Sequence, residues 1–286
     1  MHKNRKLLWG MMIVALLLSG CKNNRRTSSS SSSGIVAELS NYAELYETTG
    51  TKAKMLSREN DLEWVPYEIT GNNEIHVYTD TDKEELTGFG FAMTHSTAYW
   101  LQNMSPALKQ QALEDLLLPS GANLNIIRIP LGTSDFTYTN DFYTFNDTIG
   151  FSDYDLNGFS IERDLEYLIP SLKDALLIKP DLIFFAAPWS APGWMKTTGI
   201  LRGGSLVEGS GTTPSNEEIS YAKYLFKALE AYRAHDINIK YISLVNEPNI
   251  GFVNYPCMSM DAYQFARVAK LLGRHIKSAG YDTTIM

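Results

Sequence analysis

A short apolar run that ends in Asn246, Glu247 and Pro248 carries the residues best suited to chemistry. The run begins at Ile239 and is rich in β-branched residues, which predicts a buried strand. Pro248 would close this strand, because proline donates no ladder hydrogen bond. Glu247 would then lie at the carboxyl-terminal end, where parallel α/β folds bind their ligands. A carboxylate beside a hydrogen-bonding amide suits sugar hydrolysis, although a structural ion pair at a strand end explains the carboxylate equally well.

Four further residues lie in or just after predicted strands. Arg128 lies within a buried strand, where an arginine needs a carboxylate partner. Asp135 follows that strand, and either an Asx-turn or a ligand contact accounts for it. Trp189 and Trp194 flank a Pro-Gly turn after the next strand, and they suit either core packing or contact with a sugar ring. We expect all four to contribute to one substrate site.

From residue 88 onward, predicted strands alternate with predicted helices. Strands are expected at 88–93, 124–130, 181–187, 239–245 and 283–286, and helices at 105–118, 161–177, 215–232 and 262–272. A break at Pro170 is expected in the second helix, and Ser215 and Glu218 form a capping box at the start of the third. Long loops follow the strands and short returns follow the helices, which is typical of an α/β protein of the (β/α)8 TIM-barrel type. A doubly wound sheet is the alternative. Gly88 and Gly90 argue against it, because they lie within the first strand and open no phosphate-binding turn.

The first 34 residues have the pattern of a secreted, lipid-anchored protein. Basic residues precede an apolar stretch at 7–18 that is too short to span a membrane, and Leu18-Ser-Gly-Cys21 follows. This resembles the lipobox of bacterial lipoproteins, in which the signal is removed and the cysteine is acylated. Residues 22–34 would form a Ser-rich tether. We expect a lipid anchor on Cys21 and a place in the bacterial envelope, at the outer membrane or cell surface; a plain signal peptide is the alternative.

Composition excludes several other classes of function. A net charge of −7 and a pI near 5.3 give no basic patch for nucleic acid or for anionic membranes. The remaining cysteine, Cys257, and the five scattered histidines form no metal-ligand spacing. We therefore expect no metal and no cofactor, and no protein partner is evident.

Taken together, these motifs resemble glycoside hydrolase family 30, which contains glucosylceramidases and related β-glycosidases. The matching landmarks, in family order, are Gly88-Phe-Gly90, Met93-Thr94, residues 125–130, Ser134-Asp-Phe136, residues 188–197 and Asn246-Glu-Pro248. The resemblance implies a (β/α)8 barrel over residues 88–286. It also implies that residues 35–87, with strands at 43–49 and 74–78, supply the first strands of a β-sandwich side domain.

The resemblance also implies a role for each site residue. Glu247 matches the general acid/base, and Asn246 matches the residue that binds the sugar 2-hydroxyl. Asp135 and Trp189 match ligands of the sugar hydroxyls in the terminal subsite. Arg128 matches a charged residue near the catalytic carboxylates. The implied reaction is a retaining hydrolysis of β-glucosidic bonds, in a glucosylceramide-type substrate or a β-1,6-glucan.

Two features depart from the family pattern. Phe91 and His95 stand where the family commonly has glycine and aspartate, which points to a bacterial branch; by itself, His95 would be read as a hydrogen-bonded loop residue. The family nucleophile is a glutamate on the seventh strand, whereas this sequence accounts for about four βα units.

We therefore expect the first half of a barrel that is inactive and poorly soluble in isolation. Turnover of an aryl β-glucoside that is lost in Glu247→Gln would overturn this expectation. The alternative function is a noncatalytic, glycan-binding envelope lipoprotein.

Overall fold

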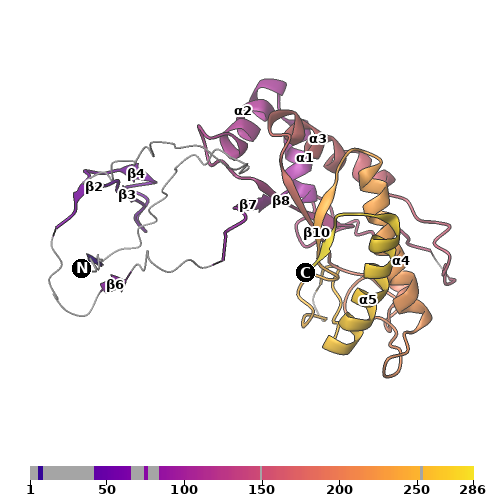
Figure 1. Ribbon diagram of the computed structural model, residues 1–286. Helices are drawn as coiled ribbons and strands as arrows, with labels where there is room; N and C mark the ends of the chain where they lie inside the picture. The colour runs from indigo at the N-terminus through magenta and orange to yellow at the C-terminus, as the bar shows by residue number, and fades with distance from the viewer. Residues whose placement is uncertain (1–5, 9–41, 66–73, 77–83, 149, 252–253) are drawn as a thin grey trace, which may run out of the picture. The chain divides into compact units, whose positions relative to one another are not determined.

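A computed structural model describes residues 6–8, 42–65, 74–76, 84–148, 150–251 and 254–286 (Figure 1). The chain divides into two compact units, Met1–Glu85 and Leu86–Met286. The predicted leader and tether lie outside the described residues, except for Lys6–Leu8. None of the helices in the described ranges is both long and apolar enough to cross a membrane.

The first unit contains short antiparallel strand pairs. These pairs are β1 (Lys6–Leu8) with β6 (Glu74–His76), β2 (Tyr42–Ala43) with β5 (Leu62–Glu63), and β3 (Tyr46–Glu47) with β4 (Ser57–Arg58). The strand expected at 43–49 is therefore two short strands, and the chain turns at Gly50. The β-sandwich itself stays a prediction.

The second unit is built on five parallel strands. They are β7 (Gly90–Ala92), β8 (Ile126–Leu131), β9 (Ile183–Pro188), β10 (Ile239–Ile242) and β11 (Thr284–Ile285). In the sheet they lie side by side in chain order. A doubly wound sheet reverses its strand order part-way, whereas a barrel adds each strand next to the previous one. The order therefore supports the barrel and excludes the doubly wound alternative.

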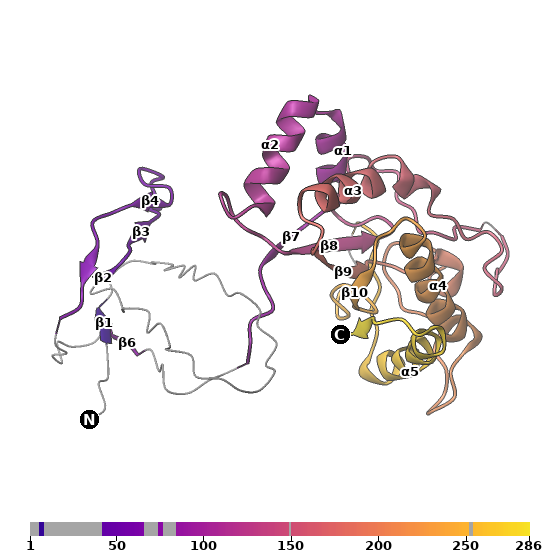
Figure 2. The same ribbon diagram turned by 45° about the horizontal axis from the view of Figure 1, so that its top comes forward.

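Helices connect these strands and lie beside the sheet (Figure 2). They are α1 (His95–Asn103), α2 (Pro106–Leu117), α3 (Leu168–Ile178), α4 (Asn216–Arg233) and α5 (Ala262–Ala279), with short 3-10 helices η1 (Glu162–Leu165) and η2 (Gly193–Met195). Helices α1 and α2 both contact α3, and α4 packs along α5. Each expected βα crossover is present.

Helix α1 is an element that sequence patterns did not reveal. Its N-cap is Thr94, whose hydroxyl accepts a hydrogen bond from the Thr97 N–H at 3.1 Å. The expectation that His95 is a loop residue is wrong, because His95 is the first residue of this helix and is buried. The Thr94 cap was the signal that could have indicated the helix.

The helix expected at 161–177 is broken before Pro170 rather than at it. The helix η1 ends at Leu165 and α3 begins at Leu168. Pro170 lies in the first turn of α3. Backbone N–H groups in a first turn make no hydrogen bond within the helix, so a proline there costs none.

The strand before Glu247 is shorter than expected, because β10 ends at Ile242. The chain nevertheless continues along β9. The Ser243 N–H donates to the Ala186 carbonyl at 2.9 Å, and the Asn246 N–H donates to the Pro188 carbonyl at 2.7 Å. Pro248 therefore does not close the strand, but the segment still reaches the carboxyl-terminal edge of the sheet.

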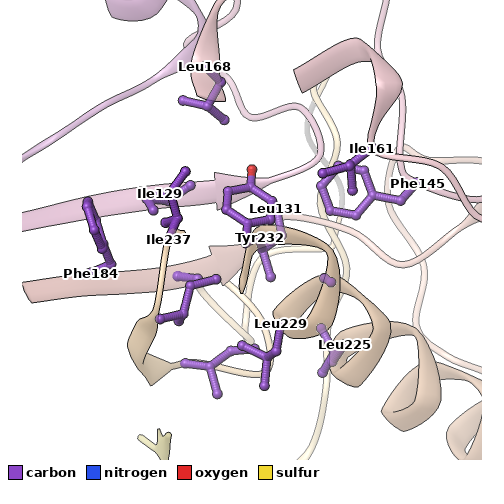
Figure 3. Packing of buried hydrophobic residues seen from close by; sticks show 14 of the residues in the cluster. Ile129, Leu131, Phe145, Ile161, Leu168, Phe184, Leu225, Leu229, Tyr232 and Ile237 are labelled. Atoms are coloured by element: carbon purple, nitrogen blue, oxygen red, sulfur yellow. The ribbon is translucent and has the colours of Figure 1, made fainter. Parts of the chain in front are cut away.

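The main core lies between the sheet and the helices. In β8, Ile127 and Ile129 are fully buried on one face, and successive strand residues point to opposite faces. Figure 3 shows Ile129 and Phe184 of the strands in the same cluster of buried side chains as Leu225 and Leu229 of α4. Arg128 therefore points to the other face of the sheet, where it is only half-buried.

A buried ion pair joins α4 to α5. Ser215 and Glu218 form the capping box that the sequence predicted. The Glu218 carboxylate is 0% exposed and accepts hydrogen bonds from Arg267 at 2.8 and 3.0 Å and from Gln264 at 3.2 Å. Burial acts to raise the pKa of Glu218, but these hydrogen bonds and those from the backbone lower it overall.

Candidate active site

Glu247 projects from the carboxyl-terminal edge of the sheet in an unusual backbone conformation. Its φ is +47°, in the left-handed region, and its carbonyl accepts a turn hydrogen bond from Ile250 at 2.8 Å. A side chain bearing Cβ pays about 1–2 kcal/mol for this conformation. The carboxylate is exposed, and Asn246 Nδ2 donates to its Oε2 at 3.2 Å. Strain of this kind gathers at functional sites.

Arg128 and Asn246 form one side of the site. Arg128 Nη2 donates to Asn246 Oδ1 at 2.5 Å, although 118 residues separate the two along the chain. The Asn246 amide is thereby fixed, with its oxygen toward Arg128 and its nitrogen toward Glu247. A fixed amide next to a carboxylate is the arrangement that the sequence motif predicted.

Aromatic rings support the arginine. The Arg128 guanidinium lies 4.6 Å from the ring centroid of Trp189 and 5.7 Å from that of Phe185. Trp189 is 6% exposed, so most of its surface packs within the protein. The indole therefore holds Arg128 by a cation–π contact, and little of its surface is left for a ligand.

The charges of two carboxylates affect the pKa of Arg128. Burial lowers the pKa of Arg128, while the charges of Glu247 and Asp135 act in the opposite direction. Asp135 is exposed on the loop after β8. The structure thus brings Arg128, Asn246, Glu247, Asp135 and Trp189 to one edge of the sheet.

Tyr255 is a site residue that the sequence analysis missed. Burial raises the pKa of Tyr255, and the nearby carboxylates of Glu247 and Asp135 raise it further. Its hydroxyl therefore keeps its proton and can donate a hydrogen bond. An aromatic-proline pair, Tyr255-Pro256, in the loop after the Glu247 segment was the available signal.

Trp194 lies in a different environment. Its indole N–H donates to the carbonyl of Asn146 at 3.1 Å and to its Oδ1 at 2.9 Å, and its ring meets Tyr154 edge-on at 5.5 Å. These contacts give Trp194 a structural role, and they do not support the prediction that it binds substrate.

Lys196 ties together the loops behind the site. Its buried ammonium donates to Ser190 Oγ at 2.8 Å, to the Leu201 carbonyl at 2.7 Å and to the Cys257 carbonyl at 2.8 Å. Burial lowers the pKa of Lys196 to about 8. The loop after β9 and the segment leading to α5 are thus held together by one buried cation.

Within the described ranges, no three His, Cys, Asp or Glu side chains come together in a way that could hold a metal ion. What the arrangement offers is an exposed carboxylate with an oriented amide, an arginine, a second carboxylate and a tyrosine hydroxyl. These groups can donate a proton and bind neighbouring hydroxyls.

Parallel strands in chain order, with polar groups at their carboxyl-terminal edge, are typical of a TIM-barrel enzyme. The profile described as "Glycosyl hydrolase family 30 TIM-barrel domain" matches residues 86–277. The chain therefore belongs to glycosyl hydrolase family 30, as its motifs indicated.

Relatives of two kinds match this chain. "Endo-1,6-beta-D-glucanase neg1" of Aspergillus fumigatus is 32% identical over 213 residues, covering 71% of this chain and 43% of that protein. "Lysosomal acid glucosylceramidase" of Mus musculus is 30% identical over 209 residues, covering 71% of this chain and 39% of that protein. The solved structure of "the endo-beta1,6-glucanase BT3312" aligns with a TM-score of 0.68 and 29% identity, over 85% of this chain and 51% of that one. The chain thus spans about half the length of these relatives or less.

Proposed function

We propose that this protein is a retaining β-glycosidase that acts on a β-1,6-glucan, with Glu247 as the general acid/base. The observation that carries the proposal is the hydrogen-bonded series from Arg128 through Asn246 to Glu247. It orients an amide and a carboxylate together at the edge of the sheet where such barrels perform chemistry.

In the first step, Glu247 donates its proton to the glycosidic oxygen while a second carboxylate attacks the anomeric carbon. The bond to the leaving sugar breaks, and a glycosyl ester forms. In the second step, Glu247 takes a proton from water, which attacks the same carbon and releases the second carboxylate. The two carboxyl groups must lie about 5–5.5 Å apart, and the family resemblance assigns the second one to a later strand.

The remaining site residues would bind the sugar. Asn246 and Asp135 offer an amide and a carboxylate to its hydroxyls, and Tyr255 offers a hydroxyl donor. Trp189 would border the sugar while it holds Arg128 in place.

The names of two similar proteins favour β-1,6-glucan over glucosylceramide as the substrate. The names of a 32%-identical relative and of a solved structure with a TM-score of 0.68 both specify β-1,6-glucanase. A lipid anchor on Cys21 would hold the enzyme in the envelope, where it would meet a polymer from outside. Glucosylceramide is the alternative substrate.

Titration calorimetry of the full chain with a β-1,6-linked glucose tetramer tests the proposal. Asn246→Ala is expected to weaken binding about tenfold, the loss of roughly one hydrogen bond to a site of this kind. Asn216→Ala, an exposed residue at the start of α4, is the matched control and should leave the affinity unchanged.

Glu247→Gln should retain binding, and wherever hydrolysis is measured it should lower the rate by about 10²–10⁴-fold. Glu230→Gln, on the exposed surface of α4, is the control. Equal affinity of the Asn246→Ala variant and the unmodified chain for the tetramer would reject the proposed site. Binding of a short-chain glucosylceramide but not of the tetramer would favour glucosylceramide as the substrate.

A further inference from the structure

We propose a second carbohydrate-binding site, formed by α1, the loop at 133–143 and the corner between η1 and α3. It would take a glucosyl unit of the same glucan chain, outside the catalytic edge. The choice of glucan as the ligand rests on the proposed function. Two features of the surface form this site: a strip of aromatic rings and a polar hollow beside it.

The aromatic strip consists of Trp100, Tyr99, Tyr138 and Tyr167. Tyr99 and Tyr138 stack with their centroids 4.3 Å apart and their planes at 11°. Tyr167 meets both rings edge-on at 5.2 and 5.4 Å, and Trp100 meets Tyr99 edge-on at 5.5 Å.

The four rings hold one another in place, and two of them are exposed to solvent. Trp100 is 62% exposed and Tyr138 is 40% exposed. The C–H groups on one face of a glucopyranose ring form a flat apolar surface, which packs well on such an aromatic face. Because the rings already hold each other in place, little side-chain freedom is lost when a sugar binds.

The hollow adjoins Tyr138 and Tyr167 and has polar walls. Its lining includes Asp141, Arg163 and Glu166. With a volume of about 40 Å³ it can take a hydroxyl or hydroxymethyl group, but not a whole sugar ring. A sugar lying on the strip would therefore place only its polar edge in the hollow.

Arg163 is fixed at the rim of the hollow. Its Nη2 lies 2.6 Å from Asp141 Oδ2, and its guanidinium lies 4.0 Å from the ring centroid of Tyr143. The Arg163 side chain is 47% exposed. Since a guanidinium has five N–H donors, groups remain for a sugar hydroxyl after the contact with Asp141.

His95 lines the hollow and is fixed by a buried hydrogen-bond network. It is one of the lining residues and is 5% exposed, and its Nδ1 has no hydrogen-bond partner among the described residues. Its Nε2 lies 2.7 Å from the Tyr143 hydroxyl and 3.2 Å from Asp164 Oδ1. The buried Asp164 also accepts hydrogen bonds from Tyr143 and Tyr232.

This network determines which proton His95 carries. The Asp164 carboxylate accepts and does not donate, so the proton is assigned to Nε2 and the lone pair of a neutral ring lies on Nδ1. His95 is therefore held in one orientation in the wall of the hollow. The polar side chains that line the hollow with it, Asp141, Arg163 and Glu166, suit a ligand that is rich in hydroxyl groups.

The hollow and the catalytic edge share one loop. Asp135 lies near the start of this loop, while Tyr138 and Asp141 lie farther along it. The Ser96 N–H donates to the Phe136 carbonyl at 3.3 Å and so fixes the loop to α1. A glucan chain bound at Asp135 could therefore extend along the loop to the strip, which would favour long substrates over short ones.

Binding of two β-1,6-linked probes, a glucose hexamer and a dimer, to the full chain tests the second site. Trp100→Ala combined with Tyr138→Ala is expected to weaken hexamer binding at least fivefold and to leave dimer binding unchanged. Tyr263→Ala, which removes a 78% exposed ring of α5, is the control and should change neither. Unchanged hexamer affinity in the folded double variant would overturn the proposal.

The same measurement in an Asn246→Ala background separates this proposal from the proposed function. Hexamer binding that persists there and is lost when Trp100→Ala is added supports the second site, whatever the catalytic edge binds. If the double variant fails to fold, the indole NMR signal of Trp100 in the unmodified chain decides, once Trp100→Phe has assigned it. A shift on addition of hexamer supports the site, and no shift overturns it.

Discussion

Two glutamates of the second unit, Glu218 and Glu247, are treated in opposite ways by the fold. Glu218 is 0% exposed and accepts hydrogen bonds from Arg267, Gln264 and the backbone N–H groups of Ser215 and Gly209. Glu247 is exposed and, among the described residues, its carboxylate accepts a side-chain hydrogen bond from Asn246. The protein fills the acceptor positions of Glu218, whereas the acid/base role proposed for Glu247 requires positions that stay open for substrate.

The backbone conformation is regular at Glu218 and strained at Glu247. Glu218 lies in the first turn of α4, where it completes a capping box. Glu247 has a φ of +47°, which a glycine would adopt more easily. The fold thus gains stability at Glu218 and loses some at Glu247, as is expected where function rather than stability selects the residue.

The largest expected effect comes from breaking the Glu218 ion pair. Arg267→Met should lower the free energy of unfolding by about 3–5 kcal/mol, because it leaves Glu218 buried and unpaired. Urea denaturation followed by circular dichroism measures this change. Lys270→Met, an exposed position on the same helix, should change stability by less than about 0.5 kcal/mol. A loss below 1 kcal/mol for Arg267→Met would mean that water reaches Glu218.

The next largest effect is on the pH dependence of stability, and it comes from the buried ammonium of Lys196. The folded pKa of Lys196 is about 8, below its ordinary value of 10.5, so between these values the unfolded chain binds more protons. Stability should therefore rise with pH across this range, by roughly 3 kcal/mol in all. Urea denaturation at a series of pH values measures the slope. Lys196→Met should remove this rise and Lys270→Met should keep it; equal slopes in the two variants would contradict the assignment.

The backbone strain at Glu247 predicts a smaller gain. Glu247→Gly should stabilise the protein by about 1 kcal/mol, because glycine adopts a positive φ without the steric cost. Thermal unfolding of the two proteins provides the comparison. Glu230→Gly, in the regular helix α4, is the control and should destabilise by about 1 kcal/mol. Destabilisation by Glu247→Gly would show that its side chain supports the fold.

The smallest effect is expected when only the charge at Glu247 is removed. Glu247→Gln should change the free energy of unfolding by less than about 0.5 kcal/mol, because the side chain is exposed and keeps its contact with Asn246. Denaturation at pH 7 tests this. A change above 1 kcal/mol would show that the Glu247 carboxylate, like that of Glu218, contributes to the stability of the fold.

Features written in a few consecutive residues could be predicted from the sequence. The capping box at Ser215 and Glu218, the strand–helix alternation and the Asn246-Glu247 pair were all of this kind. Helix α1 was missed because its Thr94 cap follows a strand without an intervening turn. The boundary of β10 was missed because hydrophobic residues continue beyond the regular ladder.

Contacts between distant residues could not be read in this way. Glu218 and Arg267 are 49 residues apart, and His95 and Asp164 are 69 apart. No local pattern announces such pairs, since they depend on which helices the crossovers bring together. Tyr255 reaches the carboxylates for the same reason.

Because Lys196 bonds to the loop after β9 and to Cys257, the reactivity of the Cys257 thiol can report when these segments separate. The Cys257 thiol is 3% exposed, its sulfur accepts from the Gly203 N–H at 3.2 Å, and its carbonyl accepts from Lys196. A thiol reagent can reach it only when these contacts separate. With Cys21 replaced by serine, the labelling rate of Cys257 would measure how often the loops joined by Lys196 separate, and bound oligosaccharide should slow that rate.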